Sequence, residues 1–339
     1  MGDRAERIRI ERLDSERPDG ERSEGDGGSA QWRAVLAAAD AGPVPVGPGG
    51  AGLRWLAWSG AGDGDGARAG SGDDVAVGAA WLRSDGRFLT AVLPDRTGDG
   101  AGAALLDAVR SAAAAEGTAD VLRTGAAKGS DAEALLVAAG FQPGEETQRM
   151  LLRVEDCDPD ALRAIVRAAS DGYHLVRWQG VAPADLLAPY AATRDALDGT
   201  AVGGPGWDEA RVRAAAEETA ARGQTRLTVA ALGLDPLGDE VVAGFSEILL
   251  PGRGGVPTGR GAARAMQSDT AVLKPHRGRG LGLWVKAAML QWLLGAHPEV
   301  EAVETVCRIG NTHMIEINET LGFRPEAREV PYQLALRRA

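Results

Sequence analysis

The chain has 339 residues, of which 44% are hydrophobic and 25% charged, a composition typical of a globular protein with two domains. Its formal net charge of −11 disfavours nucleic acid as the main partner, because binding to phosphates requires a basic surface, and suits a cationic small molecule better. No run approaches the roughly 18 apolar residues that a membrane helix requires, and residues 1–7 lack the apolar core of a signal peptide, so we expect a cytoplasmic protein with no membrane partner.

Four segments rich in glycine, aspartate or serine are predicted to form loops: residues 20–28, 60–74, 199–206 and 251–261. The first informative pattern is a predicted strand at residues 88–92, followed by a glycine turn at residues 98–102 and an apolar-periodic helix at residues 103–115. A second helical run ends at Gly140-Phe141, where glycine suits a helix C-terminus. The implied order is strand, glycine turn, helix.

A boundary between two domains is predicted near residue 154, where an acidic run at residues 155–160 interrupts the apolar strand at residues 150–152. We therefore assign residues 1–154 to a first domain and residues 155–339 to a second, which begins with a helix at residues 159–169. The two cysteines, Cys157 and Cys307, form no CxxC pair and have no histidine cluster nearby, so neither a disulfide framework nor a metal site is predicted.

The second domain repeats the pattern of the first. A strand at residues 270–272 leads to a glycine turn at residues 278–282 and then to a helix that ends before Pro298. A further helical run ends at Gly322-Phe323. Gly278 follows Gly98 by 180 residues and Phe323 follows Phe141 by 182, so the two halves are predicted to be an internal repeat.

The glycine turn before each helix has the features of an anion site. Glycines at alternate positions let several backbone N–H groups approach a phosphate at the positive end of the helix. The turn is not Gly-x-Gly-x-x-Gly, and no acidic residue ends a strand about twenty positions later, which disfavours a dinucleotide site. It also lacks the Gly-Lys-Ser/Thr ending of a nucleoside-triphosphate loop.

What remains is Arg277-x-x-Gly280-x-Gly282, which resembles the Gln/Arg-x-x-Gly-x-Gly/Ala pyrophosphate motif of the GNAT acetyltransferases. The resemblance extends over residues 267–336 and implies an α/β fold of the α+β type, with a mixed sheet and flanking helices. It also implies two tandem GNAT-like acyl-CoA N-acyltransferase domains. The first is expected to be degenerate, because Thr97 stands where the second has Arg277.

By this resemblance the cosubstrate is acetyl-CoA, and no metal is implied. The family's fourth strand splays from the fifth, and the pantetheine arm lies between them like an added strand. The backbone amides near Val272 and Leu273 would then bind the pantetheine and the thioester carbonyl, and Asn311 the pantetheine or adenine side. The pyrophosphate would lie on the following residues: Arg277, Gly278, Arg279, Gly280, Leu281 and Gly282.

The implied reaction is direct attack of a neutral amine on the thioester carbonyl, which requires a base and a donor to the oxyanion. Asp269, Glu247 and Glu304 are the candidate bases, because they lie on or near strands that would converge on the acetyl group. Strand alternation does not rank them firmly. Asp269 is the first choice because it directly precedes the edge of the CoA-binding strand.

The family's usual acid is a tyrosine five residues before the Gly-Phe phenylalanine, and this chain has Asn318 there. Its amide could hydrogen-bond the sulfur, or the thiolate could leave unaided, since an unperturbed thiol has a pKa of about 8.5. Tyr332 is another candidate donor, and His276, beside the glycine motif, could contact the phosphate or the substrate.

The leading hypothesis is N-acetylation of a primary amine on a small, for example polycationic, molecule by a monomer or homodimer. A peptide or protein N-acetyltransferase is the second, and would need an open groove between the domains. A third is a noncatalytic CoA-binding sensor or scaffold, which Asn318 and the altered first domain favour.

Overall fold

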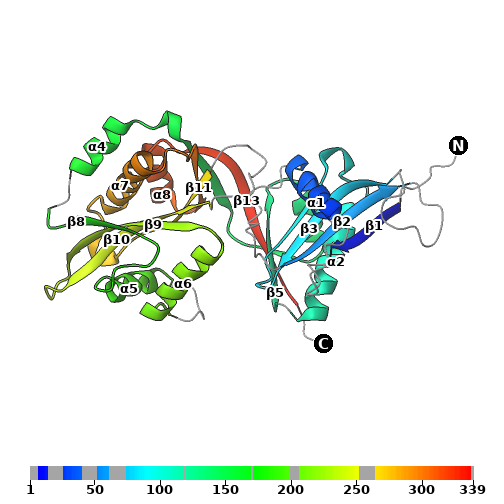
Figure 1. Cartoon of the computed structure of the whole chain (residues 1–339), viewed down its shortest axis with the longest axis horizontal. Coiled ribbons are helices and arrows are strands. Elements are labelled where there is room, and N and C mark those ends of the chain that lie inside the picture. Colours follow the sequence, from blue (N-terminus) through cyan, green and yellow to red (C-terminus); the bar gives the residue numbers. More distant parts are fainter. Residues whose placement is uncertain are drawn as a thin grey trace.

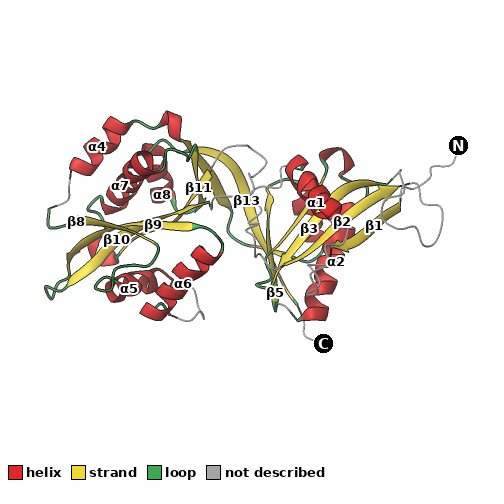
Figure 2. Cartoon of the chain, in the orientation of Figure 1, coloured by secondary structure: helices red, strands yellow, loops and turns green. Residues whose placement is uncertain are grey.

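The computed structural model describes residues 7–13, 26–39, 52–60, 74–117, 119–168, 171–198, 206–251 and 264–336. The four glycine-rich segments predicted to be loops lie wholly or mostly outside these residues. The described strands form a four-stranded and a nine-stranded sheet, each flanked by helices (Figures 1 and 2). No helix in these segments is both long and apolar enough to cross a bilayer.

The smaller sheet belongs to the first half of the chain and is antiparallel. Its strand order is β1 (Arg7–Leu13), β2 (Gly52–Gly60), β3 (Val75–Arg83) and β4 (Phe88–Val92). Helix α1 (Asp26–Ala38) packs on one face with tryptophan-rich contacts, and α2 (Ala101–Glu116) packs on the other. Strand β4 and helix α2 match the strand and helix predicted around the first glycine turn.

The larger sheet has the strand order β5-β13-β7-β12-β11-β10-β9-β8, with the two-residue strand β6 (Gln142–Pro143) beside β13. The bounds of its strands are β5 (Val121–Ala127), β7 (Thr147–Arg153), β8 (His174–Gln179), β9 (Thr225–Leu234), β10 (Glu240–Leu250), β11 (Arg264–Val272), β12 (Ala302–Arg308) and β13 (Arg324–Ala335).

Helices cover both faces of the second half of this sheet. Helices α4 (Pro159–Arg167), α7 (Leu281–Ala296) and α8 (Thr312–Thr320) lie on one face, and α5 (Leu187–Asp198) and α6 (Glu209–Ala221) on the other (Figure 1). The remaining helix, α3 (Asp131–Ala138), follows β5 in the first half. The mixed sheet with flanking helices is the predicted fold class, which is confirmed.

The two halves exchange their last strands, which the sequence did not predict. Strand β7, from the first half, pairs with β12 of the second, and β13, from the end of the chain, pairs with β5 of the first. Figure 1 shows β13 running from one half into the other. As a result, the β13 residues Val330 and Tyr332 are buried in the core of the first half with Leu122 and Phe141. Each half therefore completes the sheet of the other.

Candidate functional site

A gap opens between two parallel strands in the second half. Strand β11 pairs with β12 only where Arg264–Gln267 lies beside Ala302–Thr305. Beyond Gln267, β11 continues to Val272 and is paired only with β10. The strands therefore separate at their C-terminal ends, as the predicted splay requires. An unpaired strand edge of this kind offers backbone N–H and C=O groups to an extended ligand.

The glycine turn at the end of this gap forms an open cradle. Gly278 and Gly280 have φ values of 76° and 74°, in the left-handed region that favours glycine, and no described atom lies within 4 Å of a Cβ built on either. The first hydrogen bond recorded for helix α7 runs from Trp284 N to Gly280 O. The amides that precede Trp284 at the start of a helix lack intrahelical acceptors, so this end of α7 can bind an anion.

The structure distinguishes the two amides expected to hold the pantetheine. The Leu273 amide donates to the Ala243 carbonyl at 2.8 Å and is therefore already engaged. In the antiparallel ladder this bond makes Val272 and Gly244 a non-hydrogen-bonded pair, so the Val272 amide faces away from β10, toward the gap.

Arg277 and Asn311, also expected to contact CoA, have local partners. The Arg277 Nε donates to the Val272 carbonyl at 3.0 Å, which places the guanidinium beside the cradle. Asn311 caps helix α8, because its side chain accepts from the Met314 amide at 3.4 Å. The assignment of these residues to CoA stays a prediction.

The first half has the same cradle. Gly98 and Gly100 have φ values of 103° and 84°, again with no described atom within 4 Å of a built Cβ. The Leu93 amide donates to the Val77 carbonyl as the Leu273 amide does to Ala243. The predicted repeat is thus reproduced in the geometry of both turns. Degeneracy of the first domain stays a prediction.

The halves differ on the opposite face of the sheet. Aligned on the cradles, Asp269 corresponds to Leu89, and aligned on Gly244 and Gly78, Glu247 corresponds to Trp81. In the first half this face is an apolar cluster with Trp32, which packs from α1. The second half has a charged network there instead.

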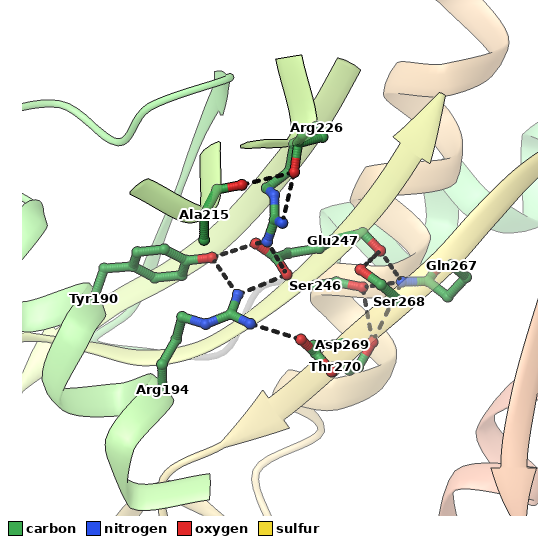
Figure 3. A network of polar contacts seen from close by, with 11 residues as sticks. Tyr190, Arg194, Ala215, Arg226, Ser246, Glu247, Gln267, Ser268, Asp269 and Thr270 are labelled. Carbon is green, nitrogen blue, oxygen red and sulfur yellow. Dashed lines mark hydrogen bonds and ion pairs between the residues drawn. The ribbon is translucent and has the colours of Figure 1, made fainter. Parts of the chain in front are cut away.

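That network is centred on Glu247, whose side chain is fully buried (Figure 3). Its carboxylate accepts from Arg194 Nη1 at 2.7 Å and from Arg226 Nη1 at 3.0 Å, and it also accepts from the Tyr190 hydroxyl. Burial by itself disfavours the charged carboxylate, but the two guanidinium groups outweigh it and lower the pKa of Glu247. Glu247 is therefore held ionised and is poorly suited to accept a proton.

Asp269 has a different environment. Arg194 bridges it to Glu247, with Nη2 2.8 Å from Asp269 Oδ2, yet 54% of the Asp269 side chain is exposed. Asp269 lies where the β10–β11 register shifts, between the pairs at Ser246 and Ile248, so a bulge helps to turn its side chain toward α5. The structure thus brings Asp269 and Glu247 together and leaves only Asp269 accessible.

Glu304 lies on β12, on the same face of the sheet as Asp269, with Arg264 Nη1 3.4 Å from its Oε2. Its side chain is buried, and burial raises its pKa despite the nearby Arg149 and Arg264. Glu304 is not part of the Arg194 network.

The two candidate donors and His276 lie in three different places. Asn318 is fully buried on the α7/α8 face, and its Nδ2 donates to Cys307 Sγ at 3.1 Å. The Tyr332 hydroxyl donates to Glu133 at 2.7 Å inside the first half, because of the strand exchange, so the suggestion that it acts at the second-half site is wrong. His276 is buried, and its Nδ1 is 2.8 Å from the Tyr173 hydroxyl.

Sequence analysis missed Arg194, Arg226 and Lys286. Arg194 follows Tyr190 by one helical turn on the buried face of α5, and Lys286 is the charged residue in the otherwise apolar first three turns of α7. A cation on an apolar helix face was the signal available for both. In the part of the chain that the structure describes, no cluster of three or more His, Cys, Asp or Glu side chains suits a metal ion.

No protein-family model matches the chain, and no curated protein matches its sequence. Solved structures do resemble it. A tandem GNAT protein from the clavulanic acid biosynthesis pathway is 24% identical with a TM-score of 0.67, over 96% of this chain and 98% of that one. A GCN5-related N-acetyltransferase from Sphaerobacter thermophilus is 16% identical with a TM-score of 0.56, over 84% and 81% of the two chains.

A third similar structure is the GCN5-related glucosamine N-acetyltransferase region of a fungal multi-domain GH3 β-N-acetylglucosaminidase. It is 13% identical with a TM-score of 0.54, over 96% of this chain and 38% of that one. The likeness to a tandem GNAT protein over nearly the whole of both chains agrees with the internal repeat. The chain therefore has the tandem GNAT fold.

Proposed function

We propose that the chain is an acetyl-CoA-dependent N-acetyltransferase whose reaction takes place in the second half. The gap between β11 and β12, which ends at the open cradle of Gly278 and Gly280, carries this proposal. A diphosphate fits the unengaged amides at the start of α7. An extended pantetheine fits the free edge of β11, where the Val272 amide faces the gap.

The acceptor would approach from the α5/α6 face, where Asp269 is exposed. Asp269 takes a proton from the attacking amine, and its ion pair with Arg194 keeps the carboxylate oriented. The Val272 amide is placed to donate to the developing oxyanion. An exposed carboxylate on this face, in a chain with a formal charge of −11, favours a cationic small-molecule amine.

The Asp269 carboxylate also supports assigning the chemistry to the second half. The corresponding face of the first half has Leu89 and Trp81 at these positions, within an apolar cluster. A proton acceptor for the amine is therefore available in the second half.

The test is a thiol-release assay with acetyl-CoA and a panel of primary amines, preceded by a calorimetric titration of the protein with CoA. We expect saturable CoA binding and amine-dependent thiol release. Binding without release by any amine in the panel would favour a CoA sensor instead. Absence of CoA binding would refute the proposal.

A further inference from the structure

Lys286 is a buried cation for which no counterion is recorded among the residues that the structure describes. It lies on α7, and only 1% of its surface is exposed. Among the described residues no hydrogen bond or ion pair is recorded for its ammonium group. Its recorded neighbours are the ring of Phe323, whose centroid is 5.5 Å from Nζ, and Cys307, with which it interacts electrostatically.

An ammonium group in such a place is costly, because burial removes its water without supplying an anion. Burial lowers the pKa of Lys286 to about 8, and the Cys307 thiol opposes this shift. Apart from burial, the recorded cause of this shift is the Cys307 thiol on β12, which accepts a hydrogen bond from the uncharged Asn318, and the Phe323 ring lies beside the ammonium. A bound ligand that carries negative charge would offset the cost of burying this ammonium group.

Lys286 lies on the side of α7 that faces α8 and β11. A Cβ built on Gly282, at the start of α7, would lie 3.3 Å from Ile317 of α8 and 3.8 Å from Val272 of β11. Lys286 comes one helical turn later and so faces the same side of α7. The ammonium therefore lies behind the cradle, between α7, α8 and β12.

Asp269 and Cys307, the neighbour of Lys286, both lie just beyond the paired segments of β11 and β12. Thr305 and Gln267 are the last paired residues of β12 and β11. Asp269 and Cys307 each follow these residues by two positions, where the strands are no longer paired with each other. The Asp269 side chain points to Arg194 on the α5 face, whereas Cys307 points to Asn318 on the α7/α8 face. A carboxylate and an ammonium group thus flank the gap on opposite faces of the sheet.

We propose that Lys286 is the proton donor to the thiolate that leaves during acetyl transfer, an inference that rests on the proposed function. The amine nitrogen forms a bond to the carbonyl carbon, and its proton passes to Asp269. The carbon–sulfur bond breaks with its electron pair on sulfur, and the Lys286 ammonium gives that sulfur a proton. Solvent then restores the proton of Lys286 and removes the one on Asp269.

The two proton affinities are well matched for this step. Burial lowers the pKa of Lys286 toward the ordinary thiol value of about 8.5, which makes its ammonium a better proton donor to a thiolate than an exposed lysine.

The test measures the pKa of the thiol of bound CoA and needs no acceptor amine. CoA is titrated on the intact chain and followed by the ultraviolet absorbance of its thiolate, after subtraction of the same titration without CoA to remove Cys157 and Cys307. In the unmodified protein we expect the bound thiol to titrate below free CoA, because the ammonium stabilises the thiolate. In Lys286→Met we expect it to titrate at or above free CoA.

Two further variants complete the design. Lys286→Arg keeps the positive charge, so the bound thiol should keep its lowered pKa. Because a guanidinium does not give up a proton readily, the rate of acetyl transfer should fall by about tenfold or more. Lys274→Met removes a surface charge of the same sign and should leave the bound thiol pKa unchanged. Lys286→Met should fold, with a raised unfolding midpoint, because it removes an unpaired buried charge.

The same bound-thiol pKa in the unmodified protein and in Lys286→Met would overturn the role of Lys286 and leave the proposed function intact. Failure of the unmodified protein to bind CoA would overturn both. The two failures are therefore distinguishable in one titration series.

Discussion

The Arg194 guanidinium and the Asp269 carboxylate form an ion pair of 2.8 Å, and the other arm of the same guanidinium is bound to the buried Glu247. Arg194 itself is 7% exposed, so it is fixed in place. Asp269 is thereby held at the surface of the α5 face by a residue that reaches it from the protein interior.

Replacing Asp269 tests its role as the base. Asp269→Asn keeps the size of the side chain and removes the proton acceptor, so the rate of acetyl transfer should fall by a factor on the order of 10² to 10⁴. CoA affinity should be unchanged, because Asp269 lies on the face opposite α7. Steady-state kinetics and calorimetry measure the two effects. Glu240→Gln, on the exposed start of β10, is the matched control; equal losses in both variants would rule out a specific role for Asp269.

Removal of the buried charge at Glu247 should reduce stability. Glu247→Gln leaves Arg194 and Arg226 without their shared carboxylate, and breaking a buried ion pair costs about 3 to 5 kcal/mol of unfolding free energy. Urea unfolding at neutral pH measures the loss. A change below about 0.5 kcal/mol, the usual range for a surface substitution, would contradict the account.

The same residue makes stability depend on pH. The folded-state pKa of Glu247 lies below its ordinary value of 4.5, so its contribution is fully present above pH 4.5 and is lost as pH falls through the folded-state pKa. The unmodified protein should therefore lose stability below pH 4.5 more steeply than Glu247→Gln. Urea midpoints measured across this range give the comparison, and parallel curves would show that Glu247 does not titrate as described.

Adding one methyl group to the cradle tests whether it binds the diphosphate of CoA. Gly280→Ala places a Cβ where no described atom lies within 4 Å, so it should fill the space of the phosphate and weaken CoA binding by about tenfold or more, or 1.4 kcal/mol. Gly117→Ala, at the end of α2, imposes a similar positive-φ strain in similarly open space. Both should cost about 1 to 2 kcal/mol of stability, but only the first should weaken CoA binding. Equal CoA affinity in the two variants would mean that the cradle does not bind phosphate.

The strand exchange predicts that the halves depend on each other. Residues 1–154 expressed alone lack β13, so β5 becomes an open edge and Leu122 and Phe141 lose Val330 and Tyr332 from their core. This half should unfold at a lower urea concentration than the same segment in the intact chain, and adding residues 155–339 should restore it. A half that is as stable alone as in the whole chain would contradict the exchange.

Local structure was largely predictable from the sequence, whereas long-range pairing was not. The strand at residues 88–92, the glycine turns and their helices follow from local rules, because φ preferences and helix periodicity act over a few residues. The exchange of β7 and β13 depends on which of two similar sheets each strand joins, and strand patterning is the same for both. Tyr332 was therefore considered for the wrong half.

In the candidate site, too, the contacts between residues distant in sequence could not be predicted. Glu247, Asp269 and Glu304 could be proposed as candidate bases from their strands, but register shifts in β10 and β11 prevent simple alternation from fixing the face of each side chain. Arg194 and Arg226 come from α5 and β9, which are distant in sequence from β11. Their ion pairs hold Glu247 buried and ionised, whereas Asp269, paired with Arg194, stays accessible.

The most direct measurement of the central claim is a crystal structure of the chain with CoA bound. The diphosphate should lie on the amides at the start of α7, beside Gly278 and Gly280, and the pantetheine should lie along β11 in the gap that opens after Gln267. CoA bound only elsewhere, with β11 and β12 closed together beyond Gln267, would contradict it.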